Sequence, residues 1–159
     1  MKHLQEKTVT RSLAKGLLAG LIGGLVSTAA KTLAEKIYPP RTHGEPEPPL
    51  VLAEKIAGHR LEGAKKLAAM ETIHWSFGAL TGAAYGALAE YYPQATAKDG
   101  AGFGMALTSL THGTALPALG LSAELEDQTT RERTSEMATH VVYGMVTETV
   151  RRVVRKMLG

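Results

Sequence analysis

Three histidines inside apolar, helix-length stretches are the residues of this 159-residue chain whose type and spacing could do chemistry. They are His74, His112 and His140. Glu71 lies three residues before His74 and Glu136 lies four residues before His140. On a helix, each of these carboxylates therefore shares a face with its imidazole. Groups of this kind can bind a metal ion, exchange a proton, or form hydrogen bonds between helices.

The spacing leaves three interpretations of these histidines open. In the first, each imidazole bonds a neighbouring hydroxyl or backbone carbonyl and only holds helices together. In the second, the histidines respond to protons, because imidazole titrates near neutral pH and nearby carboxylates tune it. In the third they bind metal, since Glu71-x-x-His74 has the spacing of dimetal helical bundles. Glu71, His74, Glu136 and His140 are then the candidate ligands, with zinc or iron as the ion. The first two interpretations require no cofactor.

Two further carboxylates, Glu90 and Glu148, are expected near the opposite end of the helices and join the histidines as candidate polar core residues. Glu148 stands three and four residues before Arg151 and Arg152. This helical spacing favours a structural ion pair over a role in transport.

Other chemistry has little support in the sequence. The chain has no cysteine, which removes disulfides and thiolate sites. It has no nucleophile elbow and no phosphate-binding loop. The net charge of +3 comes from basic residues near both ends, without interleaved aromatic residues. This pattern argues against a nucleic-acid surface. The absence of a catalytic motif favours a protein that is not an enzyme.

The histidines must be positioned by long apolar stretches, three of which carry no Asp, Glu, Lys or Arg: Gly16–Ala30, Thr72–Ala89 and Gly100–Ala123. A weaker stretch, Met137–Thr147, follows. The pattern predicts an all-α, four-helix transmembrane bundle formed by a single domain over residues 1–159. Its spans are expected at about residues 12–38, 71–92, 100–121 and 135–158. Mean hydropathy is only −0.06, so a soluble helical bundle that acts as an interaction module remains the alternative.

Local signals refine this prediction. Ser12 is a plausible N-cap, and Pro39-Pro40 ends the first helix. Apolar residues at steps of three and four predict an added amphipathic helix at about residues 50–70 in the first loop. Pro117 predicts a kink in the third span. The last helix is expected to begin near Thr134 or Ser135.

Two glycine ridges predict how the helices assemble: Gly16, Gly20 and Gly24 on the first span, and Gly78, Gly82 and Gly86 on the second. Such ridges allow helix backbones to approach closely in lipid. One ridge is expected to pack the first span against the second. The other is expected to lie against the third span or to face outward as a homodimer surface.

The chain is further expected to lie in the lipid bilayer with both termini in the cytoplasm. Four spans place both ends on one side, and both ends are basic, which fits the positive-inside rule. The basic residues are Lys2, Lys7, Arg11 and Lys15 at one end, and Arg151, Arg152, Arg155 and Lys156 at the other.

Short landmarks along most of the chain resemble the YagU-like bacterial inner-membrane family. They are Lys31 with Pro39-Pro40-Arg41, His74, Glu90 with Pro93, Gly102-Phe103-Gly104, His112, Pro117, Gly120, Ser135-Glu136, His140, Glu148 and Arg151-Arg152. The resemblance implies a multi-span protein of the bacterial inner membrane. It implies no reaction.

Overall fold

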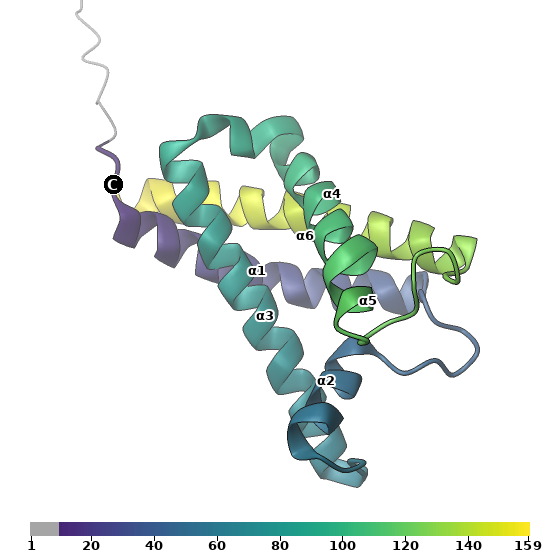
Figure 1. Cartoon of the computed structure of the whole chain (residues 1–159). Coiled ribbons are helices and arrows are strands. Elements are labelled where there is room, and N and C mark those ends of the chain that lie inside the picture. Colours follow the sequence, from purple (N-terminus) through teal and green to yellow (C-terminus); the bar gives the residue numbers. More distant parts are fainter. Residues whose placement is uncertain (1–9) are drawn as a thin grey trace, which may run out of the picture.

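The computed structural model of the protein describes residues 10–159, so Lys2 and Lys7 lie outside the described residues. All regular elements of this range are helical, which confirms the all-α prediction. The elements are α1 (Leu13–Ile37), α2 (Pro48–Ala57), α3 (Gly63–Tyr91), a 3₁₀ segment (Pro93–Gly100), α4 (Ala101–Leu110), a π-helical turn (Thr111–Ala115), α5 (Leu116–Ala118) and α6 (Thr130–Met157), as Figure 1 shows.

The first helix begins and ends where the sequence predicts, whereas the last helix ends as predicted but begins earlier. The Ser12 side chain accepts a hydrogen bond from the backbone N–H of Lys15 and caps α1. Helix α6 begins at Thr130, about one turn before the predicted start. Thr129 is its N-cap and accepts from the backbone N–H of Glu132, 3.0 Å away. The sequence Thr129-x-x-Glu132 matches a capping box, so this signal was present and was missed.

The predicted amphipathic helix over residues 50–70 is wrong as a single element. Helix α2 ends at Ala57, and Gly58 follows in the left-handed conformation, with φ 73°. Glycine adopts this conformation without steric cost, which makes it a common helix terminator. Helix α3 then starts at Gly63, so residues 63–70 belong to the same helix as the predicted second span.

The third predicted span is broken into α4, the π-helical turn and α5. Pro117 has no N–H, so a carbonyl in the preceding turn loses its helical donor. The side chain of Gln128 donates instead to the backbone carbonyl of His112 at 3.1 Å, and to that of Ala123 at 3.0 Å. The kink expected at Pro117 thus takes the form of a π-helical turn held by a residue from the next loop.

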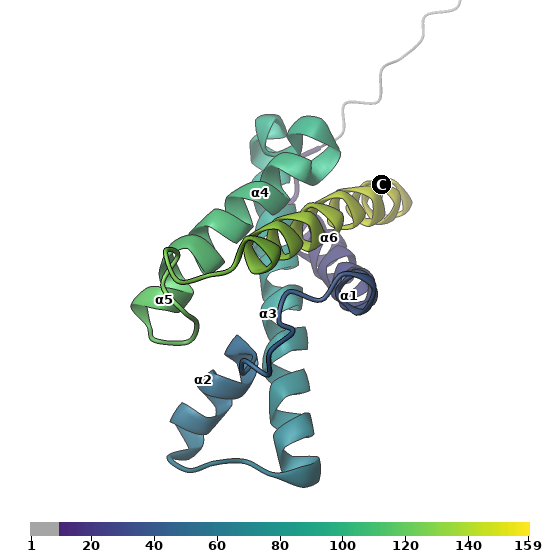
Figure 2. The same cartoon turned by 90° about the vertical axis from the view of Figure 1, so that its right-hand side faces the viewer.

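Helix α1 lies at the centre of the packing, with α3 and α6 against it and α4 against α6. Figure 1 shows α1 and α6 side by side along their lengths and α3 crossing them. Figure 2 shows α2 beside the first turns of α3. Helices α1 and α3 run antiparallel, since Gly16 approaches Gly86 closely and Gly24 approaches Gly78.

Both glycine ridges lie in this one interface between α1 and α3. A Cβ on Gly20 would lie 2.2 Å from the carbonyl oxygen of Gly82, and a Cβ on Gly82 would lie 2.5 Å from that of Gly20. The prediction that one ridge faces the third span or a homodimer partner is therefore wrong, because the ridges cover each other. A second close contact, which the sequence analysis missed, joins Gly100 and Gly104 to α6 near Gly144 and His140.

In this packing, polar side chains predominate in the interior and many large apolar side chains lie on the outside. The buried apolar side chains are few and mostly small: Ala19, Leu50, Ala53, Ala83, Tyr85, Ala89, Leu121 and Tyr143. The buried polar and charged side chains are more numerous and include Lys31, Glu136, Glu148 and Arg151. Among the described residues, α1 is the one helix long and apolar enough to cross a membrane, although a core helix of a soluble protein meets the same criterion.

Candidate functional site

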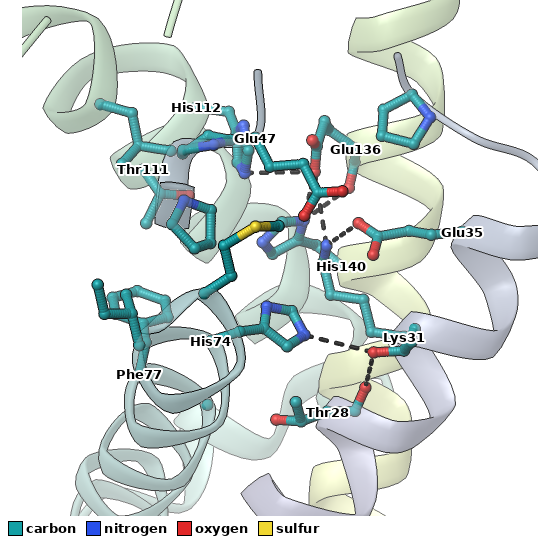
Figure 3. Close-up of a pocket in the computed structure, with 18 of the residues that line it drawn as sticks. Thr28, Lys31, Glu35, Glu47, His74, Phe77, Thr111, His112, Glu136 and His140 are labelled. Atoms are coloured by element: carbon teal, nitrogen blue, oxygen red, sulfur yellow. Dashed lines mark hydrogen bonds and ion pairs between the residues drawn. The ribbon is translucent and has the colours of Figure 1, made fainter. Parts of the chain in front are cut away.

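Two histidines and a glutamate meet at the end of the bundle remote from the termini. Glu136 and His140 lie on α6, and His112 lies in the π-helical turn after α4. The Oε2 atom of Glu136 is 3.2 Å from His112 Nε2 and 3.6 Å from His140 Nδ1. The imidazole rings stand edge to face, with centroids 5.1 Å apart. Figure 3 shows the two imidazoles beside Glu136.

Two cations from other parts of the chain reach the same carboxylate. Arg41, in the loop after α1, places Nη1 3.0 Å from Glu136 Oε1 and Nη2 3.3 Å from Glu132 Oε1. Lys31 of α1 places Nζ 3.6 Å from Glu136 Oε2 and also pairs with Glu35. This charged cluster holds three carboxylates against two cations, so one negative charge is in excess while the imidazoles are neutral.

Glu132 lies at the edge of this cluster, in the first turn of α6. Burial raises the pKa of its carboxyl, and the Arg41 guanidinium opposes that rise. Arg41 therefore holds two carboxylates at once and ties the loop after α1 to the start of α6.

One oxygen of the central carboxylate is not satisfied. Glu136 is 2% exposed, and its Oε2 atom has no hydrogen-bond partner among residues 10–159. His140 Nδ1 lies 2.8 Å from the backbone carbonyl oxygen of Glu136, which fits donation of Nδ1–H to that oxygen. The Nε2 lone pair of His140 then remains available. Buried polar atoms without partners are rare and require an explanation.

The cluster forms one wall of a cavity of about 580 Å³, here called the polar pocket. Its opposite wall carries His74, whose Nε2 atom is 3.3 Å from Thr32 Oγ1. Apolar side chains of α3, including Leu67, Met70 and Phe77, also line it, and so do the charged residues Glu47 and Glu71. Figure 3 shows His74 and Phe77 facing the interior of the pocket.

The structure brings together only part of the predicted metal set. Glu136 and His140 lie together, but their partner is His112. His74 lines the same pocket but contacts Thr32. Glu71 is exposed and accepts a hydrogen bond from Trp75 Nε1 at 2.9 Å.

The sequence did not predict a role in this site for the charged residues Lys31, Glu35, Arg41 and Glu132, although Lys31 and Arg41 are among the landmarks of the family resemblance. A signal existed for the first of these, because Lys31 ends an uncharged stretch and continues the face that carries Ser27 and Thr28. The pairing of Arg41 with α6 depends on a loop conformation that no local pattern encodes.

Glu90 and Glu148 lie at the opposite end of the bundle, as expected, and there they form ion pairs. Glu148 is 2.7 Å from Arg151 Nε and 2.6 Å from Arg152 Nε, which confirms the ion pair predicted from helical spacing. It also accepts from the Tyr85 hydroxyl at 2.8 Å. Glu90 is 2.6 Å from Arg155 Nη2. The Tyr85–Glu148 hydrogen bond and the Glu90–Arg155 ion pair join α3 to α6.

These features define a small protein whose described residues form an all-helical fold with a charged interior and one helix long and apolar enough to cross a membrane. The chain belongs to the family described as "Protein of unknown function (DUF1440)", whose model matches residues 25–149. No curated protein and no solved structure matches the chain. The matched range includes the whole polar pocket, whereas Arg151 and Arg155 lie beyond it.

Proposed function

We propose that this protein is a multi-span membrane protein that binds a ligand in its polar pocket. In this proposal α1, α3, the segment from α4 to α5, and α6 cross the bilayer. The observation that carries it is the reversed polarity of the packing, which suits a molecule whose solvent is lipid. The YagU-like resemblance agrees with it, because that family consists of multi-span proteins of the bacterial inner membrane.

Helix α6 carries the reversal most clearly. Its buried face holds Ser135, Glu136, Thr139, His140, Tyr143, Thr147, Glu148, Arg151 and Arg155. Its outward face carries apolar side chains, among them Met137, Val142, Met145 and Val153. A surface helix of a water-soluble protein has the opposite arrangement. The charges on the buried face also lower the average hydropathy of α6, so a criterion based on averages does not select it.

Helices α1 and α3 repeat the arrangement with small residues in place of charged ones. The buried face of α1 consists of glycine, alanine, serine and threonine up to Lys31. Its leucines point outward, and on α3 Leu80 is 69% exposed. In lipid, helices associate through close packing of small residues and hydrogen bonds between helices. Tyr143 donates such a bond to the Gly78 carbonyl at 2.6 Å, and Thr147 donates one to Ser27 at 2.8 Å.

The two ends of the described range, residues 10–159, lie together, as an even number of crossings requires. Lys15 Nζ donates to the Gly159 carbonyl at 2.8 Å, and Arg155 Nη2 donates to that of Thr10 at 2.9 Å. With the positive-inside rule, this supports cytoplasmic termini in a bacterial inner membrane and a polar pocket near the opposite surface.

Cysteine labelling tests the membrane proposal, because the natural chain has no cysteine. Leu80→Cys and Met145→Cys place a thiol on the outward faces, and Gly44→Cys places one in the first loop. In intact membranes, a water-soluble maleimide should label only the loop position, and all three should react after denaturation in SDS. The proposal fails if Leu80→Cys and Met145→Cys react as fast as Gly44→Cys, or if the protein remains soluble without detergent.

A second candidate function, a response to protons, uses the same side chains. Its support is the 3.2 Å between His112 Nε2 and Glu136 Oε2, because a proton added to the ring would turn this contact into a charged hydrogen bond. Nuclear magnetic resonance of the imidazole nitrogens over about pH 5–8 tests it. A titration that disappears in His112→Gln would support this function, and imidazoles that do not titrate in that range would exclude it.

A further inference from the structure

We infer that His112, Glu136 and His140 form a binding site for a divalent first-row transition-metal ion, either zinc or iron. This inference rests on the proposed ligand-binding role of the polar pocket and names the class of ligand. It replaces the predicted set based on Glu71 and His74 with a set that the fold brings together.

The first support is the position of the ligand atoms. One ligand atom from each of the three side chains lies within 4.8 Å of the other two. Tetrahedral ligands about 2.1 Å from an ion are separated by about 3.4 Å. The 3.2 Å from His112 Nε2 to Glu136 Oε2 already has this magnitude. The His140 ring lies beside the same oxygen, with its Nδ1 atom 3.6 Å away.

The second support is the unsatisfied Oε2 atom of Glu136. It is buried and lacks a hydrogen-bond partner among residues 10–159, and it faces both imidazoles as well as Lys31 Nζ, which is 3.6 Å away. A bound cation would supply the missing interaction. His140 agrees with this, because Nδ1 lies 2.8 Å from the Glu136 carbonyl oxygen. Metal-binding histidines commonly donate one ring N–H to such a carbonyl, which directs the other nitrogen at the ion.

The charges of the surrounding side chains permit a cation. Lys31 and Arg41 oppose it, but Lys31 also pairs with Glu35, and Arg41 also pairs with Glu132. Three carboxylates therefore face two cations. Two histidines and one carboxylate suit zinc or iron better than magnesium or calcium, which prefer oxygen ligands. Three protein ligands leave a coordination position free on the side of the polar pocket.

Cobalt(II) titration of the metal-free, full-length protein in detergent tests the inference. Wild type should bind one equivalent of Co²⁺, with visible absorption bands of nitrogen and oxygen coordination, and Zn²⁺ should displace it. His112→Gln and His140→Gln should each weaken Co²⁺ binding at least about tenfold, since each removes a ligand. His74→Gln is the matched control, because His74 lines the same pocket outside the group, and it should bind Co²⁺ as wild type does.

Other outcomes would overturn the inference. These are a wild type without saturable binding, equal weakening by His74→Gln and His112→Gln, or full binding in the double variant His112→Gln, His140→Gln. Zinc-edge X-ray absorption of the wild-type complex gives a measurement independent of variants, and a spectrum without histidine scattering would also overturn it. Cysteine labelling does not depend on metal, so failure here is distinguishable from failure of the membrane proposal.

Discussion

At the scale of single residues, the charges inside this protein are paired with opposite charges, several of which lie on other elements. Glu136 is held by Lys31 from α1 and Arg41 from the following loop. Glu90 of α3 is held by Arg155 of α6. Pairing of this kind is what allows a charged side chain to remain buried. Removing one partner of a buried pair lowers the stability of the fold, because the other charge then stays buried without a partner.

Glu148→Gln should therefore be strongly destabilising. Glu148 is 1% exposed, and it neutralises Arg151 and Arg152. Breaking a buried ion pair from one side costs about 3–5 kcal/mol, so the thermal midpoint of the detergent-purified protein should fall clearly. Asp99→Asn is the control, because the Asp99 side chain is 70% exposed in its pair with Arg152 and an exposed pair contributes about 0–1 kcal/mol. Equal shifts for the two variants would contradict the structural role of Glu148.

At the scale of the elements, sequence signals that act locally predicted the structure best. The cap at Ser12 and the two prolines after Tyr38 define α1. The break after α2 was not predicted, because the apolar stripe continues through Gly58 and only the backbone conformation of that glycine ends the helix. The π-helical turn was also out of reach, because its lost backbone partner is replaced by Gln128 from a later loop.

Only part of the candidate site was predicted, because only part of it depends on local sequence signals. Helical spacing places Glu136 and His140 on one face, and that pair could be predicted from the sequence. His112 joins them only through the register of α4 on α6. Gly104 sets that register, because a Cβ there would lie 2.1 Å from the His140 carbonyl oxygen. Contacts between elements distant in sequence leave no periodic signal in either segment.

Alanine at the paired glycines tests the interface of α1 with α3. In Gly20→Ala the added Cβ would meet the Gly82 carbonyl at 2.2 Å. Backbone cannot yield as a side chain can, so the helices must separate, at a cost of about 1–3 kcal/mol for overpacking. In Gly102→Ala of α4 the nearest atom is 3.4 Å away, and better helix propensity should stabilise by up to about 1 kcal/mol. Thermal midpoints that fall equally in both variants would contradict this packing.

Gln128→Ala tests how the π-helical turn is held. It removes the donor to the carbonyls of His112 and Ala123, and buried acceptors without donors cost about 1–3 kcal/mol. The thermal midpoint should fall, and Co²⁺ affinity should weaken because His112 is no longer fixed. Glu126→Ala, an exposed change in the same loop, should alter neither quantity. Wild-type stability in Gln128→Ala would show that the turn does not need this contact.

At the scale of the whole molecule, the placement of charged side chains inside and apolar side chains outside helps to explain the low mean hydropathy of the sequence. Mean hydropathy of −0.06 is low for a membrane protein, and some of the charged side chains that lower it are buried at the two ends of the interior. They lie around Glu136 at one end and around Glu148 and Glu90 at the other. The apolar residues cover the outside instead. An average over the sequence cannot separate these two sets, whereas exposed fractions in the structure can.

A charge placed on the outer face of α6 distinguishes lipid from water as the solvent of that face. Val142 is 36% exposed and lies near the middle of the helix. In a soluble bundle, Val142→Lys would change stability by no more than about 0.5 kcal/mol, as exposed substitutions usually do. In a membrane-spanning α6 it should cost about 2.5–3.5 kcal/mol, because lysine at the centre of a span is poorly solvated. Less protein should then resist carbonate extraction from membranes, and its thermal midpoint in detergent should stay close to that of wild type.

Met157→Lys is the matched control, since Met157 is 80% exposed at the end of the same helix, where lysine reaches the membrane surface. If the two variants insert equally well, α6 does not span the bilayer, and the outward apolar face requires a protein partner instead.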